Sequence, residues 1–179
     1  GSDTTYWIEV SMGTATNQGT VFWEYSDDIP VEGQPKVQFD ATVGTWSVQD
    51  PTQEVIYTFS GDCEPIGGGG AACSQEHPFG AVAAGGSGSS VDSDFKTAAD
   101  IVVAAGEDFT LDTIEVPFLT FAPTDPPTTA NVVYYEDAAG LPGAMIGSET
   151  VVPTILSSGP WVNPIADQYI TSLAVTPFT

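Results

Sequence analysis

Apolar and polar residues alternate along most of this chain, and the alternation falls into two long blocks. The first block covers residues 1–60 and contains the segments TYWIEV, TVFWEY, KVQFD, GTWSVQ and EVIYTF. The second covers residues 95–179 and includes DTIEVPFLTF, ANVVYYED and the closing segment DQYITSLAVTPFT. Successive side chains of a strand point to opposite faces, so this period of two predicts β-strands. The many β-branched and aromatic residues in these segments favour the same structure.

The stretch between the two blocks, residues 61–94, has a different composition in which Gly and Ser dominate. Such clusters are typical of loops and linkers. We therefore predict a joint with little regular structure, which carries both cysteines and the single histidine, His77.

Glycine and proline are frequent, with 19 and 14 residues, and they favour short strands joined by turns over helices. No helical pattern extends beyond about two turns. The expected fold is all-β, an antiparallel sandwich of the jelly-roll-like or immunoglobulin-like kind.

The charge balance is extreme: 24 acidic residues face only two cations, Lys36 and Lys96, and the formal net charge is -22. Nucleic acid and anionic membranes are excluded as partners, because phosphate binding requires clustered Lys and Arg. No apolar run reaches the ~18 residues of a membrane span, so none is expected. Salt screens such a charge, so a saline extracellular setting is one hypothesis, and an acidic secreted surface without that setting is the alternative.

Two cysteines, Cys63 and Cys73, flank the flexible segment EPIGGGGAA. In an extracellular protein we expect them to form a disulfide. A zinc site is not expected, since two thiols and His77 leave the fourth ligand unspecified. We interpret His77 as a solvated loop residue, and with no nucleophile–base pair in view we predict no catalytic residues and no enzyme activity.

Acidic loops offer the oxygen ligands that Ca²⁺ prefers, although none has an EF-hand spacing. Calcium is the one cofactor that the sequence suggests, and its candidate ligands are Asp27, Asp28, Asp92, Asp94 and Asp137.

Aromatic residues on a sandwich face can form a platform for a sugar. Alternation places Trp7 opposite in direction to Tyr6, and Trp23 opposite to Phe22, so one side chain of each pair is expected to point outward. Packing in the core is expected to account for most of the aromatic side chains. The candidates for ligand contact are Trp23, Tyr25, Trp46 and Trp161.

Two stretches resemble a β-sandwich module of secreted multi-domain proteins of the Bacteroidetes that are often exported by type IX secretion. The run from CSQEHPFG to TLDTIEV, followed by NVVYYEDAAGLPG, is similar to the opening half of that module, and Asp137, Gly140, Pro142 and Gly143 match its turn pattern. The segments TYWIEV and YTFSG, with Thr5, Tyr6, Trp7 and Val10, resemble its closing half. The resemblance implies that this chain carries the two halves in exchanged order.

If the chain carries the two halves of the module in exchanged order, its first strand is expected to pair with its last. The pairing can occur either within one chain or between neighbouring chains. The residues expected in this assembly are Tyr6, Trp7, Ile8 and Val10 of the first strand and Tyr169, Ile170, Leu173 and Val175 of the last.

Two functions follow from these observations. The first is a non-enzymatic extracellular structural module, a repeat or subunit of a fibre or surface adhesin that assembles head to tail with itself by strand exchange. The alternative is a carbohydrate-binding accessory module of a larger secreted enzyme, with a polysaccharide as partner.

Overall fold

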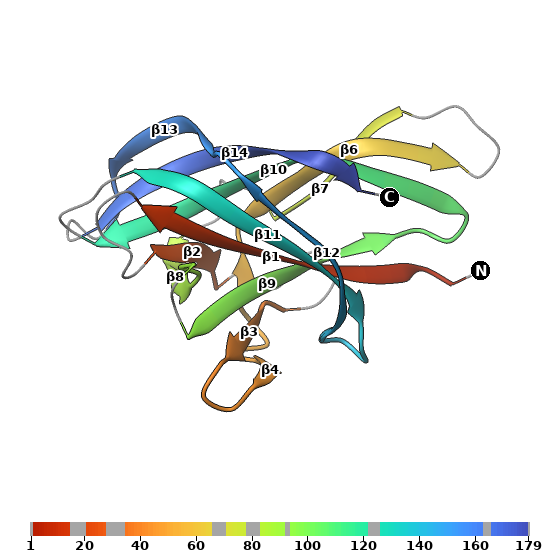
Figure 1. The fold of residues 1–179 in the computed structure, drawn as a ribbon, viewed down its shortest axis with the longest axis horizontal. Coiled ribbons are helices and arrows are strands. Elements are labelled where there is room, and N and C mark those ends of the chain that lie inside the picture. Colours follow the sequence, from red (N-terminus) through yellow and green to blue (C-terminus); the bar gives the residue numbers. More distant parts are fainter. Residues whose placement is uncertain are drawn as a thin grey trace.

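The chain folds into two antiparallel β-sheets that pack face to face, as seen in a computed structural model (Figure 1). The structure describes residues 2–14, 21–27, 35–65, 71–77, 83–91, 94–121, 126–162 and 166–178. Every regular element within these ranges is a strand. The predicted all-β antiparallel sandwich is therefore confirmed.

Sheet A has six strands in the order β12-β11-β1-β9-β3-β4. Strand β1 lies in its middle, where Trp7 pairs with Asp100 of β9 on one side and with Tyr135 of β11 on the other. The strands are β1 Thr4–Thr14, β3 Val37–Asp40, β4 Thr45–Val48, β9 Phe95–Val103, β11 Pro127–Asp137 and β12 Pro142–Val151.

Sheet B has eight strands and is organised around β10, which is 15 residues long. One side of β10 pairs with β14, and its other side pairs with β2 near one end and with β6 along the rest. Strand β13 lies beyond β14, while β8 pairs with β2 and β7 with β6. The strands are β2 Val21–Ser26, β5 Glu54–Val55, β6 Tyr57–Pro65, β7 Ala71–His77, β8 Ala83–Gly88, β10 Glu107–Phe121, β13 Thr154–Pro160 and β14 Ala166–Phe178.

The main core lies between the two sheets and comes from the alternation seen in the sequence. Every second residue of β1, namely Ile8, Val10 and Met12, is at most 2% exposed and belongs to this core. Sheet B contributes residues of β10 in the same period of two, including Val116 and Phe118. Full burial of one such side chain stabilises the fold by roughly 1.5–3 kcal/mol, so the inward faces of these strands account for much of its stability.

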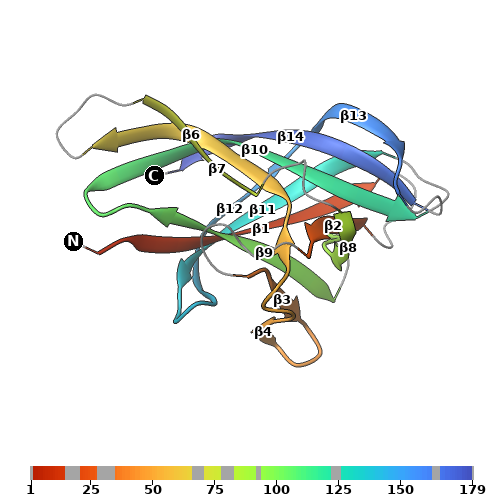
Figure 2. The same ribbon diagram turned by 180° about the vertical axis from the view of Figure 1, so that it is seen from behind.

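A second, smaller cluster covers the opposite face of β1. Trp7 points away from the main core, as its position next to Ile8 requires, and it is nevertheless fully buried. It packs with Val37 and Ala98, and the projecting β3–β4 hairpin adds Trp46 (Figures 1 and 2). Both faces of β1 are thus covered, which places this strand deep in the molecule.

The prediction that residues 61–94 form a joint with little regular structure is wrong. Three strands enter or occupy it: β6, which runs on to Pro65, β7 and β8. The small residues of β8 have low strand propensity, so the composition does not predict a strand. The segment is a strand because its backbone pairs with β2.

Within one chain, the predicted pairing of the first strand with the last is also wrong, whereas their pairing between neighbouring chains stays a prediction. Strand β1 has β9 and β11 as neighbours in sheet A, while β14 lies between β10 and β13 in sheet B. The two strands belong to different sheets, so they do not pair with each other in this fold. The N- and C-terminal ends lie toward the same end of the molecule, but in different sheets (Figures 1 and 2).

Candidate functional site

The predicted disulfide is confirmed. Cys63 on β6 and Cys73 on β7 are bonded, and their Cα atoms are 5.8 Å apart. The two strands pair antiparallel, with Gly61 opposite Cys73 and Cys63 opposite Ala71, so the bond ties two neighbouring strands of sheet B. It fixes β7, which pairs only with β6 among the described strands, to the body of the sheet.

Replacing both cysteines by serine is expected to lower the free energy of unfolding by roughly 2–3 kcal/mol, because closing a short loop restricts the unfolded chain. Urea unfolding followed by tryptophan fluorescence measures this loss. Wild-type protein treated with reductant is the matched control and should show the same loss. An unchanged midpoint in both samples would mean that β7 stays in place without the bond.

The predicted ligand-contact tryptophans have structural roles. Trp23 is completely buried, packs near Phe118 and donates a hydrogen bond from Nε1 to the Ile56 carbonyl oxygen at 2.8 Å. Its assignment as a ligand contact is therefore wrong, because its inward direction on β2 places it in the core. Trp46 packs against Phe39 and Tyr135.

Trp161 is half-buried and donates from Nε1 to a carboxylate oxygen of Glu24 at 3.0 Å. Glu24 is itself 1% exposed and also accepts a hydrogen bond from the Gln168 amide. Of the four predicted aromatics, Tyr25 lines a groove that is open to solvent.

The predicted calcium ligands that the structure describes, Asp27, Asp94 and Asp137, are not brought together. Asp28 and Asp92 lie outside the described residues. Asp137 accepts hydrogen bonds from Trp7 Nε1 and from the Gly140 backbone, so its carboxylate closes a turn. Asp27 accepts a hydrogen bond from Gln53 at 2.8 Å. Within the described ranges, no three His, Cys, Asp or Glu side chains are grouped so that they could hold a metal ion.

Several ionisable groups are buried, which the sequence did not reveal. His77 is on β7 and only 3% exposed, so the prediction of a solvated loop histidine is wrong. Glu54 is 1% exposed and Asp100 is fully buried. Burial and the neighbouring charge of Asp100 raise the pKa of Glu54 to about 9, so this carboxyl group is protonated at neutral pH.

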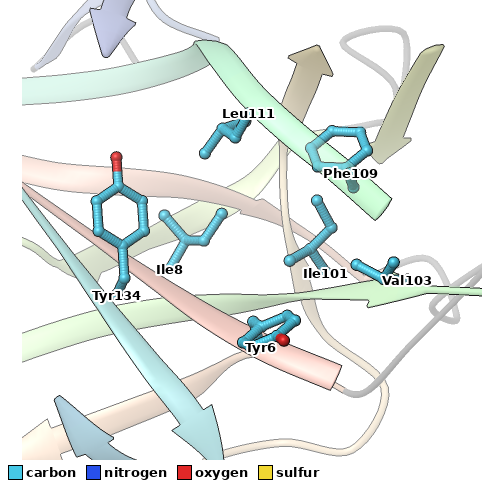
Figure 3. A pocket seen from close by; sticks show the side chains of 7 residues that line it. All are labelled: Tyr6, Ile8, Ile101, Val103, Phe109, Leu111 and Tyr134. Carbon is cyan, nitrogen blue, oxygen red and sulfur yellow. The ribbon is translucent and has the colours of Figure 1, made fainter. Parts of the chain in front are cut away.

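One end of the sandwich contains an apolar cavity (Figure 3). Its volume is about 20 Å³, which is close to the space of one water molecule. Such a space is too small for an organic ligand, so we interpret it as a packing defect between the sheets. Its lining residues are Tyr6, Ile8, Ile101, Val103, Phe109, Leu111 and Tyr134.

A much larger depression, of about 460 Å³, lies on the surface beside β2 and β8, and we call it the β8 groove. Strands β2, β3 and β9 contribute Phe22, Tyr25, Gln38 and Phe95, and the segment that leads into β5 contributes Gln49, Asp50 and Gln53. The whole set that lines it is Phe22, Tyr25, Lys36, Gln38, Gln49, Asp50, Gln53, Gly86, Ser87, Gly88 and Phe95.

Glycines of β8 allow aromatic rings to lie directly on its backbone. A Cβ atom at Gly86 would be 2.5 Å from Phe22 Cβ, and one at Gly85 would be 2.6 Å from the Tyr25 hydroxyl. Any larger residue at these two positions would displace the rings. The Gly-rich composition that predicted a loop is therefore explained by close packing within a sheet.

Polar contacts hold the rim of the groove in place. Lys36 Nζ lies 4.1 Å from the centre of the Tyr25 ring, and the Lys36 backbone N–H donates to the Gln53 carbonyl oxygen. Gln38 donates from its amide nitrogen to Ser87. Burial lowers the pKa of Lys36, while Asp50, Glu54 and Asp27 partly oppose that shift.

No protein-family profile matches the sequence, and neither the curated proteins nor the solved structures contain a match. The resemblance to a secreted Bacteroidetes module therefore stays a prediction. Among the described residues there is also no helix long and apolar enough to cross a membrane.

Proposed function

We propose that this protein is a non-enzymatic, extracellular structural module that associates with a second copy of itself through strand β13. The observation that carries the proposal is an exposed, uncharged edge strand on a protein of net charge -22. The disulfide between Cys63 and Cys73 supports an extracellular location, because such bonds persist in oxidising compartments.

Strand β13 is an open edge of sheet B. It pairs with β14 on one side, and no described strand pairs with its other side. Six of its seven residues are exposed, including Leu156 at 52% and Ile155 at 37%. Unpaired N–H and C=O groups on such an edge are satisfied when a strand of another molecule adds to it.

The absence of charge favours β13 as a contact between two copies. No charged residue occurs in residues 150–166, although the whole chain contains 24 acidic residues. Two copies repel one another wherever carboxylates meet, and that cost is low along this stretch. The β13 edge is therefore a surface on which two molecules of the same chain can approach with little repulsion.

The form of the edge limits how far pairing extends. Pro153 and Pro160 bracket the segment, and Leu156 is an extra residue in the pairing with β14. Prolines and bulges restrict edge pairing to a short length. An antiparallel contact between two β13 strands is symmetric and closes on itself, so it gives a dimer that can connect two chains of a surface assembly.

Sedimentation velocity tests this association. The protein is expected to form a dimer in roughly 0.5 M NaCl, where the Debye length is about 4 Å and repulsion is screened. Leu156→Lys should weaken the dimer by about tenfold or more, since it places an ammonium group in the contact. Val43→Lys is the matched control, because Val43 is 68% exposed in the turn before β4 and the charge change is identical.

A wild-type protein that stays monomeric at high salt and high concentration would contradict the proposal. Equal effects of Leu156→Lys and Val43→Lys would also contradict it, because they would show that charge alone, rather than the β13 edge, controls association.

A further inference from the structure

We infer that the β8 groove is a binding site for a neutral saccharide chain. This site is separate from the dimer contact proposed above, because β8 and β13 lie at opposite edges of sheet B. The inference uses the aromatic rings, the amides and the charge of the groove, and it does not depend on self-association.

The groove presents aromatic surface of the kind that sugars contact. Phe95 is 42% exposed at its rim, and Phe22 and Tyr25 are half-buried within it. The C–H groups on one face of a pyranose ring form an apolar surface that packs on an aromatic ring. Phe22 is fixed by an edge-on contact with Phe121, with 5.2 Å between ring centres, so this part of the groove is rigid before a ligand arrives.

Three glutamines supply polar groups that match hydroxyls. Gln38, Gln49 and Gln53 all line the groove, and each amide nitrogen donates to a neighbouring side chain: to Ser87, Ser47 and Asp27, respectively. These contacts orient the three amides. Each amide oxygen is an acceptor with two lone pairs, which suits the hydroxyl donors of a sugar.

The charge of the groove selects a neutral ligand. Asp50 is among its lining residues, and Asp27 is held to Gln53. The one cation that lines it, Lys36, is 4% exposed and lies over the Tyr25 ring. A uronate or sulfate group would therefore meet carboxylates without an accessible cation, on a protein of net charge -22.

The shape fits a chain better than a single small molecule. The volume of about 460 Å³ lies within the range of roughly 300–1,000 Å³ that is typical of organic ligand sites. The groove is open along the surface, and Gly86 and Gly88 of β8 are among the residues that line it. A polysaccharide can lie across such an open groove with only a few of its units in contact.

Affinity electrophoresis tests the inference with four probes. Native gels would contain hydroxyethyl cellulose, barley β-glucan or galactomannan as neutral chains, or alginate as an anionic chain. The protein should carry Leu156→Lys, so that the result does not depend on the dimer. We expect at least one neutral polysaccharide to retard it and alginate to leave its mobility unchanged.

Two substitutions locate the site. Phe95→Ala and Gln49→Ala alter exposed side chains of the groove, and each should weaken binding by about tenfold or more in calorimetric titration with the retarding polysaccharide. Val48→Ala is the matched control, since Val48 has the same exposure of 42% as Phe95 but does not line the groove. It should bind as the parent does.

Three results would overturn the inference: no retardation by any of the three neutral chains, retardation by alginate as strong as by a neutral chain, or binding that survives both Phe95→Ala and Gln49→Ala. Thermal melting of each variant checks the fold. Because Gln49 is an exposed side chain in a turn-rich segment, the Gln49→Ala result remains interpretable even if Phe95→Ala lowers stability.

Discussion

Trp23→Ala is expected to lower the free energy of unfolding by about 4 kcal/mol, the magnitude typical of removing a large aromatic side chain from a core. Trp23 is completely buried, and its ring lies 6.1 Å from that of Phe118. The substitution leaves a cavity and also removes the donor that satisfies the Ile56 carbonyl oxygen. Urea denaturation monitored by circular dichroism measures the loss.

Phe95→Ala is the control for this experiment, because Phe95 is an exposed aromatic residue and should cost little stability. The comparison separates the two roles that an aromatic residue can have in this protein. An unfolding midpoint that Trp23→Ala leaves unchanged would contradict the role of Trp23 in the core.

Glu54→Gln is expected to stabilise the protein at neutral and alkaline pH, by on the order of 3 kcal/mol at pH 7. Burial and the charge of Asp100 raise the pKa of Glu54 from 4.5 to about 9. In the folded protein the group is therefore protonated at pH 7, whereas in the unfolded chain it is ionised. Glutamine has nearly the shape of the protonated acid and never ionises, so it removes this difference.

The pH dependence has a definite sign. The folded state binds one proton more than the unfolded state between pH 4.5 and about 9, so the contribution of Glu54 is fully present below pH 4.5 and is lost as pH rises toward 9. The stability difference between Glu54→Gln and wild type should grow by about 1.4 kcal/mol per pH unit in this window.

Denaturation series at pH 5, 6, 7 and 8 measure that growth. Glu64→Gln is the matched control, because it makes the same chemical change on an exposed residue of β6. Parallel stability curves for Glu54→Gln and wild type would show that Glu54 is ionised in the folded protein, contrary to its buried position.

Local alternation was sufficient to predict strands over Tyr6–Val10, around Trp23 and along the closing segment, because the period of two is a property of each strand alone. The disulfide was also predictable, since Cys63 and Cys73 are separated by only 10 positions. The net charge of -22 also follows directly from the composition of the sequence.

Strand partners were not predictable, because a strand shows its apolar face in its own sequence but not the neighbour that takes its hydrogen bonds. Tyr6–Val10 pairs with β9 and β11, and the closing strand with β10 and β13. The pairing of the strands leaves β13 as an open edge of sheet B. Pairing with β2 is also the reason that a glycine-rich stretch forms the strand β8. The β8 groove exists because residues as distant in sequence as Phe22 and Phe95 lie against the same glycine-rich strand, an arrangement that only packing of the two sheets creates.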